Sequence, residues 1–260
     1  VSVLQVWGYD ERRCRWRSNF LTNRGDTLLS RDQLGKFEEF VRTRVPGVQL
    51  RRKEETWSQK VIGTLLQAFN PYYMVRYIST FYPVVYFPTK EGYESRPVAS
   101  FMSLAHEYVH LRDTMKHPFW FRLSYLLPQV LILPLLVLGV VLSLYIGWWA
   151  TPFFVLANVC VLPLPAPWRV NWERRGYAMT LAVNYWLTGT IPPANVLLVK
   201  LSFVGWGYYR MSWSEEQTNA WVQRTLAKIY SGQLELEPEY REVHDFMVTE
   251  GLKSAIKAST

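Results

Sequence analysis

The stretch from Leu123 to Trp168, which carries no formally charged side chain, constrains the fold of this chain more than any other feature. A membrane-spanning helix needs roughly 20 apolar residues, so the stretch has room for two helices and a turn. Gly147-Trp-Trp-Ala-Thr-Pro152 is the expected turn, which gives helices near 124–146 and 152–167. The second helix is short and ends in a proline-rich segment, so a re-entrant or shallow helix is an alternative. A hairpin buried in a soluble core is less favoured, because soluble helices rarely run this long without a polar stripe.

The motif His106-Glu107-Tyr-Val-His110 lies just before this stretch. On a helix, the spacing of HExxH puts both imidazoles on one face, one turn apart, where they can bind one Zn²⁺. Glu107 then lies beside the metal, where it can take a proton from zinc-bound water. His117 also lies in this segment, so three of the four histidines cluster here. Pro97 suits the first turn of the helix, which we expect to end near residue 115.

A catalytic zinc site needs a third protein ligand. His117 follows His110 by two helical turns, about 10 Å along the axis, which is too far for one metal on a straight helix. Glu173 begins a helix directly after the apolar stretch, and two membrane crossings would return it to the side of the histidines. We therefore expect Glu173 to be the ligand, the alternative being a helix-start carboxylate near the helix dipole. Asp113 is expected either to accept a hydrogen bond from an imidazole N–H or to lie on the helix surface.

An oxyanion stabiliser completes such a site. Tyr177 lies one turn after Glu173 and is the nearest candidate, followed by Tyr208 and Tyr209, although each could instead be a packed or interfacial tyrosine. The segment 83–87 is the best strand candidate in the chain, and we expect it to pair with an extended substrate.

The expected fold is mainly α with a small β element: a zincin-like HExxH helix plus a transmembrane helical hairpin. Three regions follow from composition, namely an N-terminal α+β region (1–96), a region with the zinc-site helices and the hairpin at about 123–168 (97–207), and a polar C-terminal helical region (208–260). Amphipathic periodicity also predicts an N-terminal helix over 32–45.

The net charge of +8 suits an anionic membrane surface. No basic run is interleaved with aromatics as in a nucleic-acid groove, and Glu54-Glu55 follow directly on the basic cluster 51–53, so no nucleic-acid partner is expected. Basic residues flank the hairpin while its turn has none, so the positive-inside rule places the zinc site on the cytoplasmic side. Cys14 and Cys160 do not make a disulfide framework, and the first residues lack a signal-peptide pattern.

The order HExxH, apolar hairpin and helix-borne glutamate resembles the integral-membrane gluzincin peptidases, which include the CAAX prenyl protease type 1 and the bacterial heat-shock membrane protease. The resemblance covers about 97–180. It departs from the family in the spacing to Asp113, which is two residues shorter, and in Glu173-Arg-Arg-Gly-Tyr, where the family has Glu-x-x-Ala-Asp. The Pro-Ala-Pro and Glu-x-Arg-Gly-Tyr segments also resemble metallopeptidases encoded by large bacteriophages, which would make the virion a possible location.

These features predict a membrane-embedded zinc-dependent peptidase in which zinc-activated water hydrolyses the peptide bond and Glu107 is the general base. Its partners would be the lipid bilayer and a peptide or protein substrate. One alternative is a structural or interaction protein, such as a bacteriophage virion component at a membrane or a homo-oligomeric assembly, that keeps the zinc site for stability. Another is a soluble helical protein with a chance HExxH.

Overall fold

The computed structural model describes most of the chain between residues 29 and 252. The described residues are 9–10, 15–16, 29–66, 74, 78–88, 93–127, 129–161, 167–205 and 210–252. They form a mainly helical structure with a small three-stranded sheet and a separate two-stranded pair, as the sequence predicts at this coarse level.

Ten α-helices lie in this part of the chain. They are α2 (Arg31–Arg44), α3 (Trp57–Leu66), α6 (Pro97–Lys116), α7 (Pro118–Leu126), α8 (Ile132–Ile146), α9 (Thr151–Val161), α10 (Val170–Thr188), α11 (Pro193–Val204), α12 (Glu215–Tyr230) and α13 (Pro238–Thr249). Short 3₁₀ turns connect them: η2 (Lys53–Glu55), η3 (Gln129–Leu131), η4 (Gly147–Ala150), η5 (Pro167–Arg169) and η7 (Gln233–Leu236). The strands are β1 (Tyr9–Asp10), β2 (Arg15–Trp16), β3 (Gln49–Arg52), β4 (Ser79–Phe81) and β5 (Val84–Phe87).

Helix α2 shows why the sequence folds as predicted near its start. Ser30 caps the helix by accepting from the backbone N–H of Gln33, and the Gln33 side chain accepts in return from the Ser30 N–H. Phe37 and Val41 recur at helical spacing and are buried. The predicted helix over 32–45 is thus confirmed within a residue at each end.

The strand order in the larger sheet is β3-β5-β4, with β3 parallel and β4 antiparallel to the central strand β5. The predicted strand at 83–87 is confirmed as β5. Its expected role in pairing with a substrate is wrong, because both of its edges are already hydrogen-bonded to neighbouring strands. The outer edge of β4 pairs with no strand in the described part of the chain.

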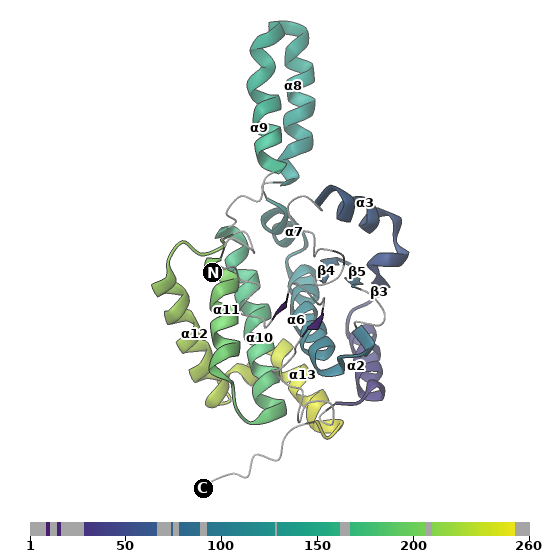
Figure 1. Ribbon diagram of the computed structural model, residues 1–260, viewed down its shortest axis with the longest axis vertical. Coiled ribbons are helices and arrows are strands. Elements are labelled where there is room, and N and C mark those ends of the chain that lie inside the picture. The colour runs from purple at the N-terminus through teal and green to yellow at the C-terminus, as the bar shows by residue number, and fades with distance from the viewer. Residues whose placement is uncertain are drawn as a thin grey trace.

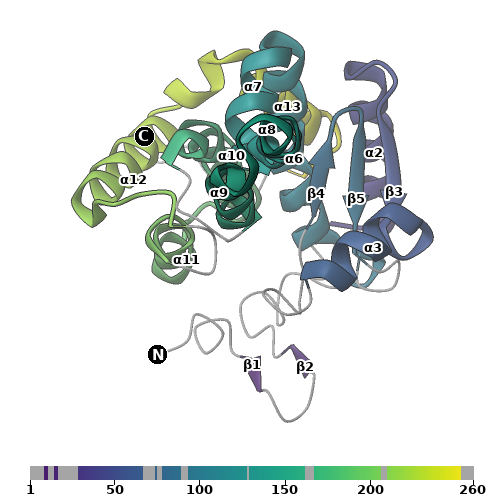
Figure 2. The ribbon, with the colours of Figure 1, turned by 90° about the horizontal axis from the view of Figure 1, so that it is seen from above.

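Helices α6 and α10 pack side by side at the centre of the body (Figure 1). Viewed from above, the sheet and α2 lie on one side of this pair, and α11 and α12 lie on the other (Figure 2). Both helices bury a large share of their apolar side chains, and burying each such side chain stabilises the fold by about 1.5–3 kcal/mol. The buried residues include Phe101, Leu104, Tyr108, Val109, Met179, Leu181, Val183 and Trp186.

The uncharged stretch forms two antiparallel helices, α8 and α9, which project from the body (Figure 1). By composition, and by length as one continuous run, the segment Ile132–Cys160 passes as a membrane-spanning helix, and only 6% of its most apolar window is buried. The chain turns at η4 within this segment, so its two antiparallel arms have 15 and 11 residues. The helix predicted near 124–146 is interrupted, because α7 ends at Leu126 and the next helical turn begins at Gln129. The second predicted helix begins at Thr151 and is described to Val161; residues 162–166 lie outside the described residues.

Candidate metal centre

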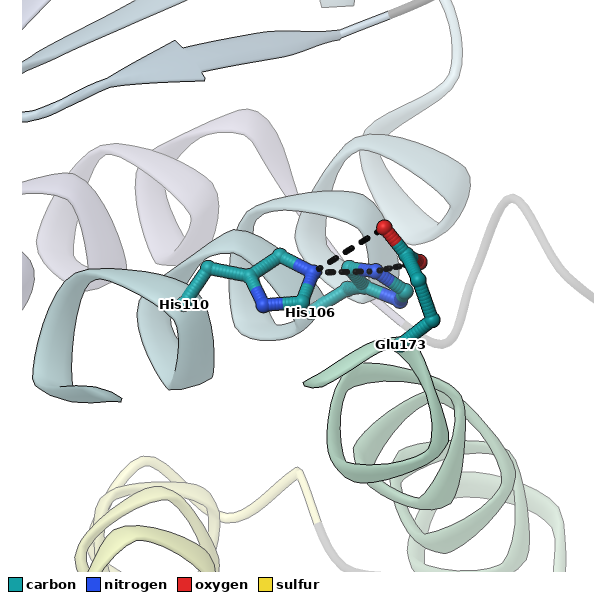
Figure 3. A group of neighbouring side chains, drawn as sticks. All are labelled: His106, His110 and Glu173. Carbon is teal, nitrogen blue, oxygen red and sulfur yellow. Dashed lines mark hydrogen bonds and ion pairs between the residues drawn. The ribbon is translucent and has the colours of Figure 1, made fainter. Parts of the chain in front are cut away.

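Two histidines of α6 and one glutamate of α10 point toward one another (Figure 3). The Nε2 atoms of His106 and His110 are 3.1 Å apart. Glu173 Oε2 lies 3.5 Å from His106 Nε2, and Glu173 Oε1 lies 3.8 Å from His110 Nε2. One donor atom from each of the three residues lies within 4.8 Å of the other two. This group could hold a metal ion.

Two of the three donor residues are buried, whereas the His106 side chain is 12% exposed. His110 is 1% exposed and Glu173 is fully buried. Burial alone would raise the pKa of Glu173, but its interactions with His106 and His110 outweigh burial and lower the pKa, so the carboxylate stays ionised. Burial lowers the pKa of His110, whereas Glu173 raises it, and the net result is a raised pKa. Metal binding would release that proton, because a ligating imidazole is neutral.

Two observations fit the group to a metal ion. Glu173 Oε2 is buried and has no hydrogen-bond partner among the described residues, although it faces the imidazole of His106. Buried polar atoms are normally satisfied, so an orphaned carboxylate oxygen beside two imidazoles matches a cation ligand. The second observation is Gly176, one turn after Glu173, where an added Cβ would lie 2.5 Å from His106 Nε2. Helix α10 therefore approaches His106 more closely than a side chain at this position would allow.

Neighbouring side chains hold the ligands in place. Tyr125 of α7 donates its hydroxyl to Glu173 Oε1 at 2.6 Å. Thr180 of α10 lies 3.2 Å from His106 Nδ1 through its hydroxyl oxygen. Such partners fix the orientation of a ligand and the tautomer of an imidazole. The sequence interpretation missed both. Thr180 is seven residues after Glu173 and so shares its helix face, whereas no local pattern marks Tyr125.

The acid of the HExxH motif faces the sheet. Glu107 Oε2 accepts a 2.6 Å hydrogen bond from the hydroxyl of Thr80 on β4. Strand β4, which lies at an edge of the described sheet and contacts α6, is thus joined to the residue between the two histidines. Thr80 is a further residue that the sequence interpretation did not single out.

The other predicted residues have mixed outcomes. The ring of Tyr177 lies edge-on to His106, with centroids 4.9 Å apart, so this tyrosine borders the group. His117 is exposed at the end of α6, outside the three-residue group, and its ring lies 6.0 Å from that of Trp172. Tyr208 and Tyr209 lie outside the described residues.

Neither predicted environment for Asp113 is correct. Asp113 is buried, and both of its carboxylate oxygens accept from Nε of Arg175, at 3.1 and 3.0 Å. His110 Nδ1 has no hydrogen-bond partner within the described chain, so Asp113 does not orient that imidazole. The physical reason is that Asp113 faces the guanidinium of α10, and this charge is the stronger partner for a buried carboxylate.

No protein-family model, curated protein or solved structure matches this chain. The function must therefore be argued from the geometry of its own residues.

Proposed function

We propose that this protein is a membrane-bound zinc-dependent peptidase. The convergence of His106, His110 and Glu173 from two helices supports this most strongly. Two imidazoles and one carboxylate make a ligand set that zinc uses in hydrolytic sites, where three protein ligands leave one position open. Because all three donors come from two helices that pack against each other, the site is preorganised.

Glu107 is the general base in this proposal. A bound zinc ion would lower the pKa of a coordinated water to about 7 and polarise the substrate carbonyl. Glu107 would accept a proton from water and return it to the leaving amine. The hydrogen bond from Thr80 holds one carboxylate oxygen of Glu107, which leaves the other available for this exchange. Tyr177, beside His106, remains our candidate for stabilising the oxyanion.

The substrate would bind along β4. An extended peptide can add to the open edge of a sheet through main-chain hydrogen bonds. Thr80 lies in β4 and contacts Glu107, so a peptide on that edge would run close to the proposed base. This assignment replaces the substrate role that the sequence suggested for β5.

Polar side chains on the projecting hairpin support the membrane attachment. Ser143, Thr151 and Asn158 each donate a hydrogen bond to a backbone carbonyl of their own helical segment, those of Val140, Trp148 and Phe154 respectively. Such bonds satisfy polar groups without water, as a hydrocarbon environment requires. From the basic residues that flank the hairpin, we propose that the metal centre lies on the cytoplasmic side.

Metal analysis with a peptidase assay tests the proposal. Purified wild-type protein should contain one zinc ion per chain and cleave members of an unstructured peptide library. Glu173→Ala should lose the zinc, whereas Glu107→Gln should keep it and lose cleavage. Glu216→Ala, which removes an exposed carboxylate on α12, is the matched control and should resemble the wild type. Cleavage by Glu107→Gln at the wild-type rate would refute the role of the base.

A structural or interaction protein that retains the metal site, for example a virion component at a membrane, is the alternative. The deep burial of His110 and Glu173 favours it, because structural zinc sites are closed to solvent. It predicts that Glu173→Ala lowers the melting temperature while neither wild type nor Glu107→Gln cleaves any peptide.

A further inference from the structure

Large aromatic side chains are exposed where the hairpin leaves the body. Trp57 of α3 is 76% exposed, and Phe119 and Trp120 of α7 are 66% and 67% exposed. Helices α3 and α7 lie at the hairpin end of the body (Figure 1). Trp168, at the base of the hairpin, is also exposed. We call these four residues the aromatic face. Tryptophan is enriched where proteins meet the membrane–water interface.

Charge separates this end of the body from the opposite one. Helices α3 and α7 and the described hairpin contain no Asp or Glu, while Lys60 and Arg122 are exposed on them. Glu54 and Glu55 directly precede α3 and are exposed, whereas Asp113 and Glu173, the acids nearest in sequence to α7 and the hairpin, are buried. Acidic residues gather instead in η7, in α13 and at the residue between them, and α13 lies at the end far from the hairpin (Figure 1). They are Glu235, Glu237, Glu239, Glu242 and Asp245. The far-end acids are largely paired with basic side chains, so the charge argument concerns the hairpin end alone. There an anionic lipid surface would attract Lys60 and Arg122.

The base of the hairpin is hydrogen-bonded directly to α7 and its C-terminal end. The indole N–H of Trp168 donates to the carbonyl of Leu127 at 3.0 Å. The indole N–H of Trp172 donates to the hydroxyl of Ser124 at 2.8 Å. Helix α7 has nine residues and is therefore about 13 Å long, so no part of it lies far from the hairpin base. Headgroup regions add roughly 5–8 Å on each side of the hydrocarbon core, so an inserted hairpin would bring α7 to their level.

We propose that the aromatic face is a second membrane-contact surface, which rests in the headgroup layer and holds the metal centre at the level of the membrane surface. This inference rests on the proposed insertion of the hairpin. Tyr125 joins α7 to Glu173, so the metal ligands lie directly behind this surface. The substrate is consequently a peptide bond held close to the bilayer, as in the juxtamembrane segment of an anchored protein.

Site-specific fluorescence on the full-length protein tests the surface. Cys14→Ser and Cys160→Ala provide a cysteine-free background, into which single cysteines are introduced by Trp57→Cys, Trp120→Cys, Val137→Cys or Leu236→Cys. Each is labelled with an environment-sensitive nitrobenzoxadiazole dye. The protein is then reconstituted in vesicles of phosphatidylcholine and phosphatidylserine that carry nitroxides at the headgroup or in mid-chain. Val137 lies on α8 of the hairpin. Leu236 is an apolar residue on η7 that is 69% exposed, as Trp120 is at 67%.

We expect the dyes at 57 and 120 to shift to shorter wavelengths and to be quenched most by headgroup nitroxides. The dye at 137 should be quenched most by mid-chain nitroxides, and the dye at 236 by neither.

If 57 and 120 behave like 236 while 137 is quenched, the second surface is refuted and hairpin insertion stands. A blue shift at 57 and 120 without nitroxide quenching would show that another copy of this chain covers the face, and would also refute the proposal. If 137 is not quenched either, insertion and surface both fail. Zinc content, measured on the same preparations, tests the metal site separately.

Discussion

At the scale of single residues, the close approach of α10 to His106 depends on Gly176. A methyl group at this position would collide with the imidazole. Gly176→Ala should therefore displace His106 and weaken zinc binding, with an overpacking cost of about 1–3 kcal/mol in the free energy of unfolding. Gly35→Ala on α2 is the control, because nothing lies within 4 Å of its added Cβ, and it should stabilise the protein by up to about 1 kcal/mol. Zinc affinity by competition with a chelator checks this, and unchanged affinity in Gly176→Ala would contradict it.

A second residue, Lys53, makes stability depend on pH. Burial lowers the pKa of Lys53 to about 7 from 10.5, although the charge of Glu107 partly offsets the effect. Between these values the unfolded chain binds a proton that the folded protein lacks. The free energy of unfolding should therefore rise with pH, by at most about 1.4 kcal/mol per unit. The rise in the free energy of unfolding is complete above the pKa of Lys53 in the unfolded chain and is lost as the pH falls toward 7.

Lys53→Met should flatten this dependence between pH 7 and 9 and should raise stability most at the lower pH. Denaturant unfolding of the wild type and the variant at several pH values measures the two slopes. Lys60→Met, which removes an exposed lysine of α3, serves as the control and should keep the wild-type slope. If the free energy of unfolding has the same pH dependence in Lys53→Met and the wild type, burial does not lower the pKa of Lys53.

At the scale of elements, Arg175 joins α6 and α10, the two helices of the candidate metal centre, to α13. Its guanidinium contacts Asp113 of α6, Glu237 and Glu239, and Tyr240 of α13 donates its hydroxyl to the Arg175 carbonyl. Arg175→Met leaves the buried carboxylate of Asp113 without this partner, and breaking such a pair costs about 3–5 kcal/mol. Adding Asp113→Leu to this variant should recover part of the lost stability, because no unpaired carboxylate is then left buried. Melting temperatures of the two single variants and the double variant measure the coupling, and additive losses would contradict it.

The sequence predicts those elements whose signals are local. The helix that carries HExxH is predicted from Pro97 at its start and from the four-residue spacing of His106 and His110, and it runs from Pro97 to Lys116. The break after α7 was missed, because an uncharged stretch carries no periodicity, although Pro128 disfavours helix at the residue before it. Glu173 was found only by reasoning about topology. Tyr125 and Thr80 could not be predicted, because their contacts depend on how α7 and β4 pack against distant helices.

At the scale of the whole molecule, the hairpin and the body are separable. The hairpin buries almost nothing against the body, and the hydrogen bonds at its base involve residues outside α8 and α9. The metal ligands come from α6 and α10, which share the core. A fold organised in this way should tolerate removal of its apolar projection.

Replacing Ile132–Val161 with a short Gly-Ser linker should give a protein that stays in solution without detergent and retains one zinc ion per chain. Its melting temperature should lie within a few degrees of the wild-type value, since the removed side chains are mostly exposed. The variant should no longer sediment with vesicles of phosphatidylcholine, because it lacks the hairpin and these vesicles carry no net charge to attract Lys60 and Arg122 beside the aromatic face. Sedimentation, zinc analysis and calorimetry provide the three measurements, with the full-length protein in detergent as the reference. Loss of zinc or of cooperative unfolding would show that the hairpin is part of the folded core.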